Sequence, residues 1–280
     1  MVWRRIASKL AATAGLVSGG TAIWWCSDKT KQQNTVYASW TSGFVPSVKW
    51  DFNWDRRNPE DLVKPVEDKN DEAQIAERKK KIKELKPTAV RHLILIRHGQ
   101  YHMNGSDKGT LTSLGQEQAA FTGKRLQELG FDYDFMVYST MPRATETAEI
   151  IHKFLPNVEM TSCNFLREGS PIPPEPPIGN WKPEAQEFFE DGARIEAAFR
   201  KYIHRADPSQ TKDSYEIYTC HGNVIRYFVC RALQFPPEAW LRLSLHNGSI
   251  TWLTVRPNGR VTLRELGDCG HIPANKLSTS

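Results

Sequence analysis

The feature that most constrains the fold is the aliphatic stretch Leu-Ile-Leu-Ile at residues 93–96, which runs directly into Arg97, His98 and Gly99. An apolar run without alternation indicates a strand covered on both faces, as in a mostly parallel sheet flanked by helices. Arg97 and His98 then fall at the carboxyl edge of that strand, where open α/β sheets form their ligand crevices. The alternative is that these two side chains solvate the end of a strand.

Strand-like and helix-like segments alternate through residues 88–280. Further strands are predicted at residues 134–140 and 215–220, and a hairpin at residues 251–266 turns at Asn258-Gly259. Such alternation predicts an α/β fold, a three-layer sandwich with a mostly parallel sheet flanked by helices.

Helix signals separate the predicted strands. Ser113 and Gln116 are spaced as a capping box, and Gly130 is placed to end the helix that they begin. Pro142 occupies a position suited to the first residue of the next helix.

Cationic residues follow three of the strands: Arg97 and His98 the first, Arg143 the second, and His221 the strand at 215–220. The strand-edge rule brings all of them to one crevice. Because these groups would repel one another, an anion is expected between them, and phosphate matches the guanidinium fork. Taken singly, Arg143 could instead pair with Glu146, and His221 could be a core histidine.

The N-terminal segment, residues 1–31, has Lys9 as its only charge between Ile6 and Cys26, and no acidic residue before Asp28. Its uncharged run from Leu10 to Cys26 reaches the length of about 17 residues that spans a bilayer. A single transmembrane helix with mitochondrial targeting is predicted, because import signals are basic and poor in acids. A cleaved secretory signal is the competing interpretation.

Residues 32–87 are predicted to be a linker with two embedded elements. Residues 71–86 have the pattern of a charged helix, whose basic cluster is more typical of a solvated face than of a membrane or nucleic-acid site. The other element is a tryptophan-rich motif, which we call the WDFNWD motif: Trp50, Asp51, Phe52, Asn53, Trp54 and Asp55. Large aromatic side chains are costly to leave in water, which indicates an interface, either with another subunit or folded back on the same chain.

Composition excludes several classes of protein. A net charge of +5 without a basic stripe does not favour nucleic-acid binding. The five cysteines lack metal or disulfide spacing, so we expect reduced thiols. No metal-binding or phosphate-loop motif is present in the sequence.

Five motifs occur in one order: LIRHGQ, LTSLGQEQA, VYSTMPRATETAEI, LREG and TCHGNVIR, between residues 95 and 226. This series resembles the histidine phosphatase superfamily, in the phosphoglycerate mutase clan. Within the clan, the N-terminal segment, the WDFNWD motif and the stretch REGSPIPPEPP resemble the mitochondrial serine/threonine protein phosphatases.

The resemblance implies a role for each site residue. His98 would be the nucleophile that accepts phosphate, and Arg97, Arg143 and His221 would bind its oxygens. Glu168 would protonate the leaving oxygen and then activate water, although a loop carboxylate is more often simply solvated. No metal or cofactor is implied. Neutral imidazole suits the nucleophile, and fixed cations suit the developing charge.

The resemblance also implies phosphoprotein substrates, among them stress-activated MAP kinase kinase kinases of the apoptosis-signal-regulating type. It implies a single-pass anchor in a mitochondrial membrane, the outer one, and a homo-oligomer, with the WDFNWD motif driving assembly from dimer to higher forms and raising activity. Gln100 and Tyr101 stand where the mutases have Glu and Ser, which favours hydrolysis over mutase activity. The alternatives are a small-metabolite phosphatase or mutase, and a mitochondrial scaffold protein.

Overall fold

The computed structural model describes residues 45–106, 108–179 and 181–279. The chain divides into two units at Lys49, and the second unit, Trp50–Ser280, is compact. The predicted membrane anchor lies outside the described residues. Within the described ranges, no helix has the length and apolar character needed to cross a membrane.

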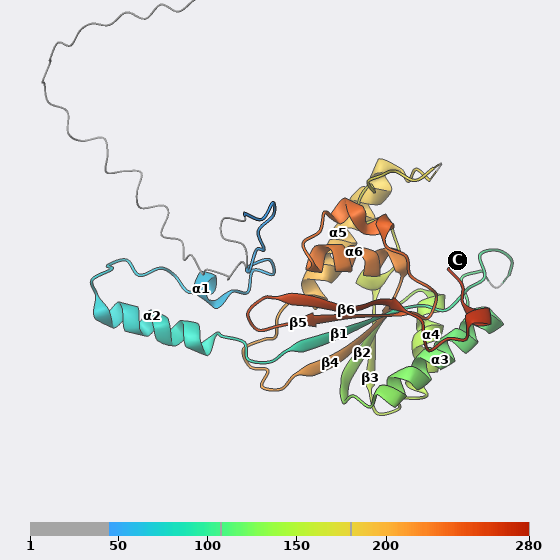
Figure 1. Ribbon diagram of the computed structural model, residues 1–280, viewed down its shortest axis with the longest axis horizontal. Coiled ribbons are helices and arrows are strands. Elements are labelled where there is room, and N and C mark those ends of the chain that lie inside the picture. The colour runs from blue at the N-terminus through green and yellow to red at the C-terminus, as the bar shows by residue number, and fades with distance from the viewer. Residues whose placement is uncertain (1–44, 107, 180, 280) are drawn as a thin grey trace, which may run out of the picture. The chain divides into compact units, whose positions relative to one another are not determined.

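The second unit is built on a six-stranded mixed sheet in the order β3-β2-β4-β1-β5-β6 (Figure 1). The first four strands of that order run parallel, and β5 and β6 add an antiparallel hairpin at one edge. The bounds are β1 (Arg91–Arg97), β2 (Tyr133–Ser139), β3 (Glu159–Cys163), β4 (Ser214–Cys220), β5 (Ile250–Val255) and β6 (Val261–Asp268). The predicted strands and the hairpin are therefore confirmed, while β3 was not predicted.

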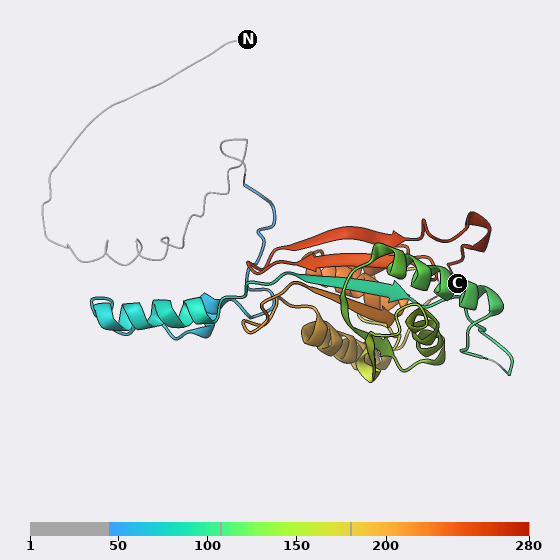
Figure 2. The same cartoon turned by 90° about the horizontal axis from the view of Figure 1, so that it is seen from below.

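Helices cover both faces of the sheet (Figures 1 and 2). In β1, Leu93 and Leu95 belong to the core shared with α5 and α6, whereas Ile94 and Ile96 belong to the core shared with α3 and α4. The unpatterned apolar run thus reflects burial on both sides. The four helices are α3 (Ser113–Leu129), α4 (Pro142–His152), α5 (Ala185–Tyr202) and α6 (Gly222–Ala232).

The start of α3 differs from the predicted capping box. Thr112, in extended conformation, is the N-cap, and its hydroxyl accepts a hydrogen bond from the Gly115 backbone N–H at 3.0 Å. Ser113 is already the first helical residue, so its side chain is one position too late to cap. The other two signals are confirmed: Gly130 ends α3 in the left-handed conformation at φ 65°, and Pro142 begins α4.

The remaining helices are short or exposed. Helix α2 (Glu72–Glu84) confirms the charged helix, with Asp71 as N-cap and Lys81 Nζ 2.6 Å from Glu77 Oε1. None of its residues is buried against the rest of the described chain. The others are α1 (Pro59–Leu62) and the 3-10 helices η1 (Asn164–Leu166), η2 (Pro237–Arg242) and η3 (Ala274–Lys276).

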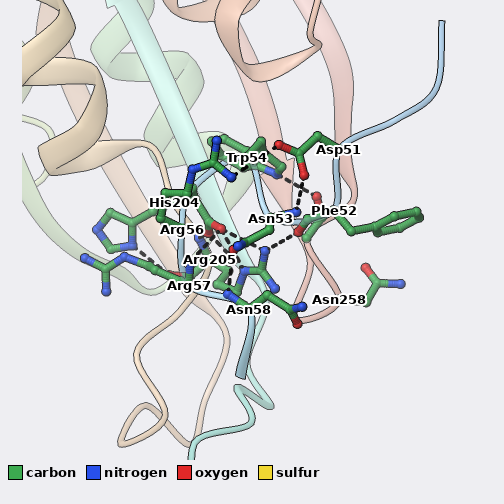
Figure 3. A network of polar contacts seen from close by, with 12 residues as sticks. Asp51, Phe52, Asn53, Trp54, Arg56, Arg57, Asn58, His204, Arg205 and Asn258 are labelled. Carbon is green, nitrogen blue, oxygen red and sulfur yellow. Dashed lines mark hydrogen bonds and ion pairs between the residues drawn. The ribbon is translucent and has the colours of Figure 1, made fainter. Parts of the chain in front are cut away.

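The WDFNWD motif packs against residues of α5, of the segment after it and of the β5–β6 hairpin of its own chain (Figure 3). The Trp54 ring lies 5.9 Å from that of Phe199, and its Nε1 donates to the Gly259 carbonyl at 2.8 Å. Asp55 forms a buried ion pair with Arg205 at 2.7 Å, and their side chains are 1% and 2% exposed. The compact unit therefore begins at Trp50 rather than at residue 88, and the structure shows the folded-back arrangement of the motif.

Gly259 serves both the hairpin turn and this contact. Its φ of +81° favours glycine, and a Cβ would lie 2.7 Å from both Arg205 Nη2 and the Phe52 carbonyl oxygen. The Asn258-Gly259 turn thus forms part of the surface on which the motif rests.

Candidate active site

The sheet topology brings the predicted site residues together. Arg97 and Cys220 are register partners in the parallel strands β1 and β4, so His98 and His221 leave the sheet side by side. Their ring centroids lie 5.1 Å apart. Strand β2, on the other side of β4, ends at Ser139 and leads into α4, whose second residue is Arg143. The strand-edge prediction is therefore confirmed in geometry.

His98 is held as a neutral base. It is 2% exposed, and its Nδ1 lies 2.7 Å from the Gly99 carbonyl oxygen, which can only accept. The proton must then be on Nδ1, which leaves the Nε2 lone pair to accept from Arg143 Nε at 3.1 Å. Burial and the Arg143 charge hold the pKa of His98 well below its usual 6.5. Nε2 is thus an unprotonated nitrogen facing a guanidinium.

His221 is fully buried beside it. Its Nε2 lies 2.7 Å from the Ser139 hydroxyl, while its Nδ1 has no hydrogen-bond partner among the described residues. Burial, with the neighbouring His98 and Arg143, lowers the pKa of His221 well below 6.5. Because buried polar atoms are nearly always paired, the unpaired Nδ1 marks a position that a ligand can satisfy.

Arg97 is fixed by two backbone carbonyls. It donates to Leu245 O at 2.5 Å and to Thr279 O at 2.9 Å, while its buried Nε has no partner within the described ranges. Burial and the nearby Arg226 lower its pKa to about 10, so it stays charged at neutral pH. A held cation with a spare donor is suited to a phosphoryl oxygen.

Arg143 stacks with Tyr101, its guanidinium carbon 4.5 Å from the ring centre. The Tyr101 ring also lies 5.3 Å from that of His98, edge to face. The alternative pairing of Arg143 with Glu146 is not seen, since the Glu146 carboxylate accepts from the Leu111 N–H at 2.7 Å.

Glu168 follows η1 in a loop and is half-buried. Burial raises the pKa of its carboxyl, against the opposing effect of Arg143 and of the N–H groups of Gly169 and Asn223. A carboxyl with a raised pKa keeps a proton available at a higher pH, as a general acid requires.

Several residues at the site were not assigned from sequence. Ser139 holds His221, Asn223 donates from Nδ2 to Gly169 O at 3.1 Å, and Arg226 lies near Arg97 and Glu168. Asn223 and Arg226 fall inside the quoted HGNVIR motif, which was the signal for them. The WDFNWD motif packs at Phe199, Arg205 and Gly259, apart from these residues.

Metal ligands show no comparable grouping. In the part of the chain that the structure describes, no three His, Cys, Asp or Glu side chains are placed to share a metal ion.

Comparison with known proteins gives a consistent result. The family description "Histidine phosphatase superfamily (branch 1)" matches residues 93–171 and 175–268. The chain is 51% identical to the mitochondrial serine/threonine-protein phosphatase PGAM5 of Mus musculus, with 99% of each chain covered. It is 56% identical to the Homo sapiens protein of the same name, over 86% of this chain and 84% of that one.

A solved structure supports the fold alone. Bacillus stearothermophilus YhfR is 22% identical, with a TM-score of 0.51, over 65% of this chain and 100% of that one. With the family description matching both stretches of the catalytic part, and relatives more than 50% identical over most of the chain, the chain belongs to the histidine phosphatase superfamily, branch 1.

Proposed function

We propose that this protein hydrolyses phosphoserine and phosphothreonine in proteins through a phosphohistidine on His98. The observation that carries the proposal is the neutral, buried Nε2 of His98, which faces Arg143 and lies beside His221. The relatives named as mitochondrial serine/threonine-protein phosphatases supply the substrate class.

In the first step, His98 Nε2 attacks the phosphorus atom and the bond to the seryl oxygen breaks. Glu168 gives its proton to that oxygen, and Arg97, Arg143 and His221 stabilise the charge on the other phosphoryl oxygens. The Nδ1 proton, held on Gly99 O, stays in place and supports the cationic phosphoimidazolium.

In the second step, water attacks the phosphohistidine. The Glu168 carboxylate takes a proton from that water, the N–P bond breaks, and Nε2 recovers its lone pair as phosphate leaves. Dividing hydrolysis into two in-line displacements lowers the barrier of each.

A small-metabolite phosphatase or mutase is the second candidate function. Initial rates on phosphopeptides, 3-phosphoglycerate and fructose bisphosphates, measured with one preparation, separate the two. Higher kcat/KM for the metabolites would contradict the protein-phosphatase proposal. Inactivity on all of these substrates would favour the scaffold alternative. The stress-activated MAP kinase kinase kinases remain a prediction of the resemblance as protein substrates.

Glu168→Gln is expected to slow phosphoserine peptides by about 10²-fold and p-nitrophenyl phosphate by a few-fold, because an aryl oxide leaves without a proton. The raised pKa of Glu168 adds a pH prediction: kcat/KM for phosphopeptides falls as pH rises through that pKa. This decrease should be absent in Glu168→Gln. Steady-state rates from pH 5 to 9 on both substrates check it. Equal losses on the two substrates would remove Glu168 from this role.

Location follows from residues 1–31, which lie outside the described residues. We propose that they anchor the protein in a mitochondrial membrane, the outer one. Deleting residues 1–27 is expected to move the protein from carbonate-washed membranes to the soluble fraction, because the remaining sequence has no comparable apolar run. Retention of the shortened form in washed membranes would contradict the proposal.

Self-association is proposed through the WDFNWD motif, with the copies assembling from dimers into higher forms. In this proposal, the surface that holds Trp54 in its own chain, formed by Phe199 and Gly259, would hold the motif of a second copy through the same contacts. Trp54→Ala is expected to give smaller assemblies and slower turnover. Sedimentation velocity and phosphopeptide rates on the same samples check both. Trp181→Ala, which removes a 41% exposed tryptophan outside the motif, is the control for assembly. Unchanged assembly would contradict the proposal.

A further inference from the structure

The loop that carries Glu168 has little regular structure of its own. Helix η1 ends at Leu166, and Glu168 follows two residues later. The Glu168 carboxyl accepts from the N–H of Gly169, its own neighbour, at 3.3 Å, and from the N–H of Asn223 at the start of α6. These bonds orient the carboxyl only if the backbone of the loop is itself held in place.

Arg194 of α5 supplies that support. Its Nη1 donates to the carbonyl oxygens of Phe165 at 3.2 Å and Arg167 at 2.5 Å, and its Nη2 donates to Glu168 O at 3.0 Å. One guanidinium thus binds three carbonyls in the stretch that ends with the acid itself. Its planar fork suits this task, since several donors are held in fixed directions.

Asp191, one turn earlier on α5, completes the contact. Its Oδ1 accepts from Arg194 Nη2 at 2.6 Å, and its Oδ2 accepts from the Ser170 N–H at 2.9 Å. The carboxylate therefore orients the guanidinium and also binds the loop directly. We call this pair of side chains the α5 clamp.

The close packing of helix and loop depends on two glycines. A Cβ on Gly169 would lie 2.3 Å from Asp191 Cγ and 2.6 Å from Arg194 Nη2. A Cβ on Gly192 would lie 2.5 Å from the Pro171 carbonyl oxygen. The absence of side chains at these positions lets the helix meet the loop backbone.

We propose that Arg194 and Asp191 are positioning residues for catalysis, which hold the Glu168 loop so that its carboxyl reaches the leaving oxygen. The inference rests on the proposed function in that Glu168 must act as the proton donor. A general acid has to lie within about 2.6–3.2 Å of the atom that it protonates. A misplacement of about 1 Å can cost about 10²-fold in rate.

Loss of the clamp should therefore affect substrates that need a proton. In the full-length protein, Arg194→Met is expected to slow a phosphoserine peptide by about 30-fold and p-nitrophenyl phosphate by about threefold or less. Arg194→Lys, which keeps one cationic donor, should recover part of the loss. The matched control is Arg200→Met on the same helix, where a 75% exposed side chain pairs with Glu196, and it should leave both rates unchanged.

A double-mutant cycle separates positioning from a general structural effect. In the Glu168→Gln background, Arg194→Met should have almost no further effect on the phosphoserine peptide, because residues that act through one group are not additive. Equal slowing of both substrates, or full additivity with Glu168→Gln, would overturn the proposal.

Two further variants keep the test decisive if Arg194→Met does not fold. Asp191→Asn removes the charge and retains the shape, and Gly169→Ala displaces the clamp from the loop side. Both variants should slow the phosphoserine peptide more than p-nitrophenyl phosphate. If wild-type protein hydrolyses small alkyl phosphates but no phosphopeptide, the protein-substrate proposal fails. The clamp proposal is then tested with alkyl and aryl phosphates. Equal slowing of the two by the clamp variants would overturn it.

Discussion

His98→Ala is expected to reduce turnover of phosphopeptides by about 10³-fold or more, because it removes the imidazole that forms the covalent intermediate. His221, the nearest imidazole, has its Nε2 on Ser139. During turnover, wild-type protein should carry an acid-labile, base-stable phosphate label that the variant lacks. Initial rates and rapid acid and alkaline quenching measure the two effects.

Two further variants serve as controls. One keeps a polar side chain at position 98, so that the fold is retained, and the other removes a histidine elsewhere in the chain. His98→Asn keeps a side-chain amide that can donate to Gly99 O and should be as inactive as the alanine variant. His152→Ala removes a histidine bonded to Val158 O at the end of α4 and should remain active. Near-normal turnover by either His98 variant, or a label that persists in it, would show that the nucleophile is another residue.

The pH behaviour of this nucleophile follows from its surroundings. Burial and Arg143 depress the pKa of His98, so the free enzyme keeps the imidazole neutral down to a pH well below 6.5. Burial acts in the opposite sense on Glu168 and raises the pKa of its carboxyl. Burial therefore favours the uncharged form of both groups.

The sequence predicted the parts of the site that lie at strand ends. The run at residues 93–96 indicated a doubly covered strand, and the strand-edge rule then placed His98, Arg143 and His221 together. These predictions succeeded because parallel strands converge by topology, whatever the intervening loops contain.

Contacts between distant segments left no such signal. In the sequence, Arg194 is an ordinary helical arginine. Only the packing of α5 against the Glu168 loop shows its contact with Glu168, which lies 26 residues away in the chain. Likewise, nothing in the sequence paired Asp55 with Arg205, which is separated from it by 150 residues. Such contacts depend on tertiary packing, which local periodicity does not encode.

Helix α5 joins two of these contacts. Arg194 holds the Glu168 loop, Phe199 packs against Trp54, and Arg205, just beyond the helix, binds Asp55. The WDFNWD motif and the acid loop thus rest on one rigid element. A change in the packing of the motif against α5 can therefore be transmitted through this helix to the Glu168 loop. The phosphopeptide rates of Trp54→Ala test this coupling.

The ion pair that seats the motif is expected to contribute strongly to stability. Arg205→Met should lower the free energy of unfolding by about 3–5 kcal/mol, because the buried Asp55 carboxylate loses its cationic partner and keeps only the backbone N–H groups of positions 57 and 205. The variant also loses the donors to Phe52 O at 2.5 Å and to both Asp55 oxygens. Urea unfolding at pH 7, followed by tryptophan fluorescence, measures the change. Arg200→Met, which breaks the more exposed pair with Glu196, should cost less than about 1 kcal/mol.

Two further measurements assign the loss to the pair itself. Burial opposes ionisation of Asp55, but its bonds to Arg205 outweigh this and hold the pKa below its usual 3.8. The stabilisation is therefore fully present above about pH 4 and is lost as pH falls through the folded pKa, so the gap between wild type and Arg205→Met should narrow in acid. The double variant Asp55→Leu/Arg205→Met should be more stable than Arg205→Met alone, since the buried carboxylate at position 55 is then removed as well. A gap that is constant with pH, together with a double variant less stable than either single one, would mean that Arg205 stabilises the fold through packing and not through its charge.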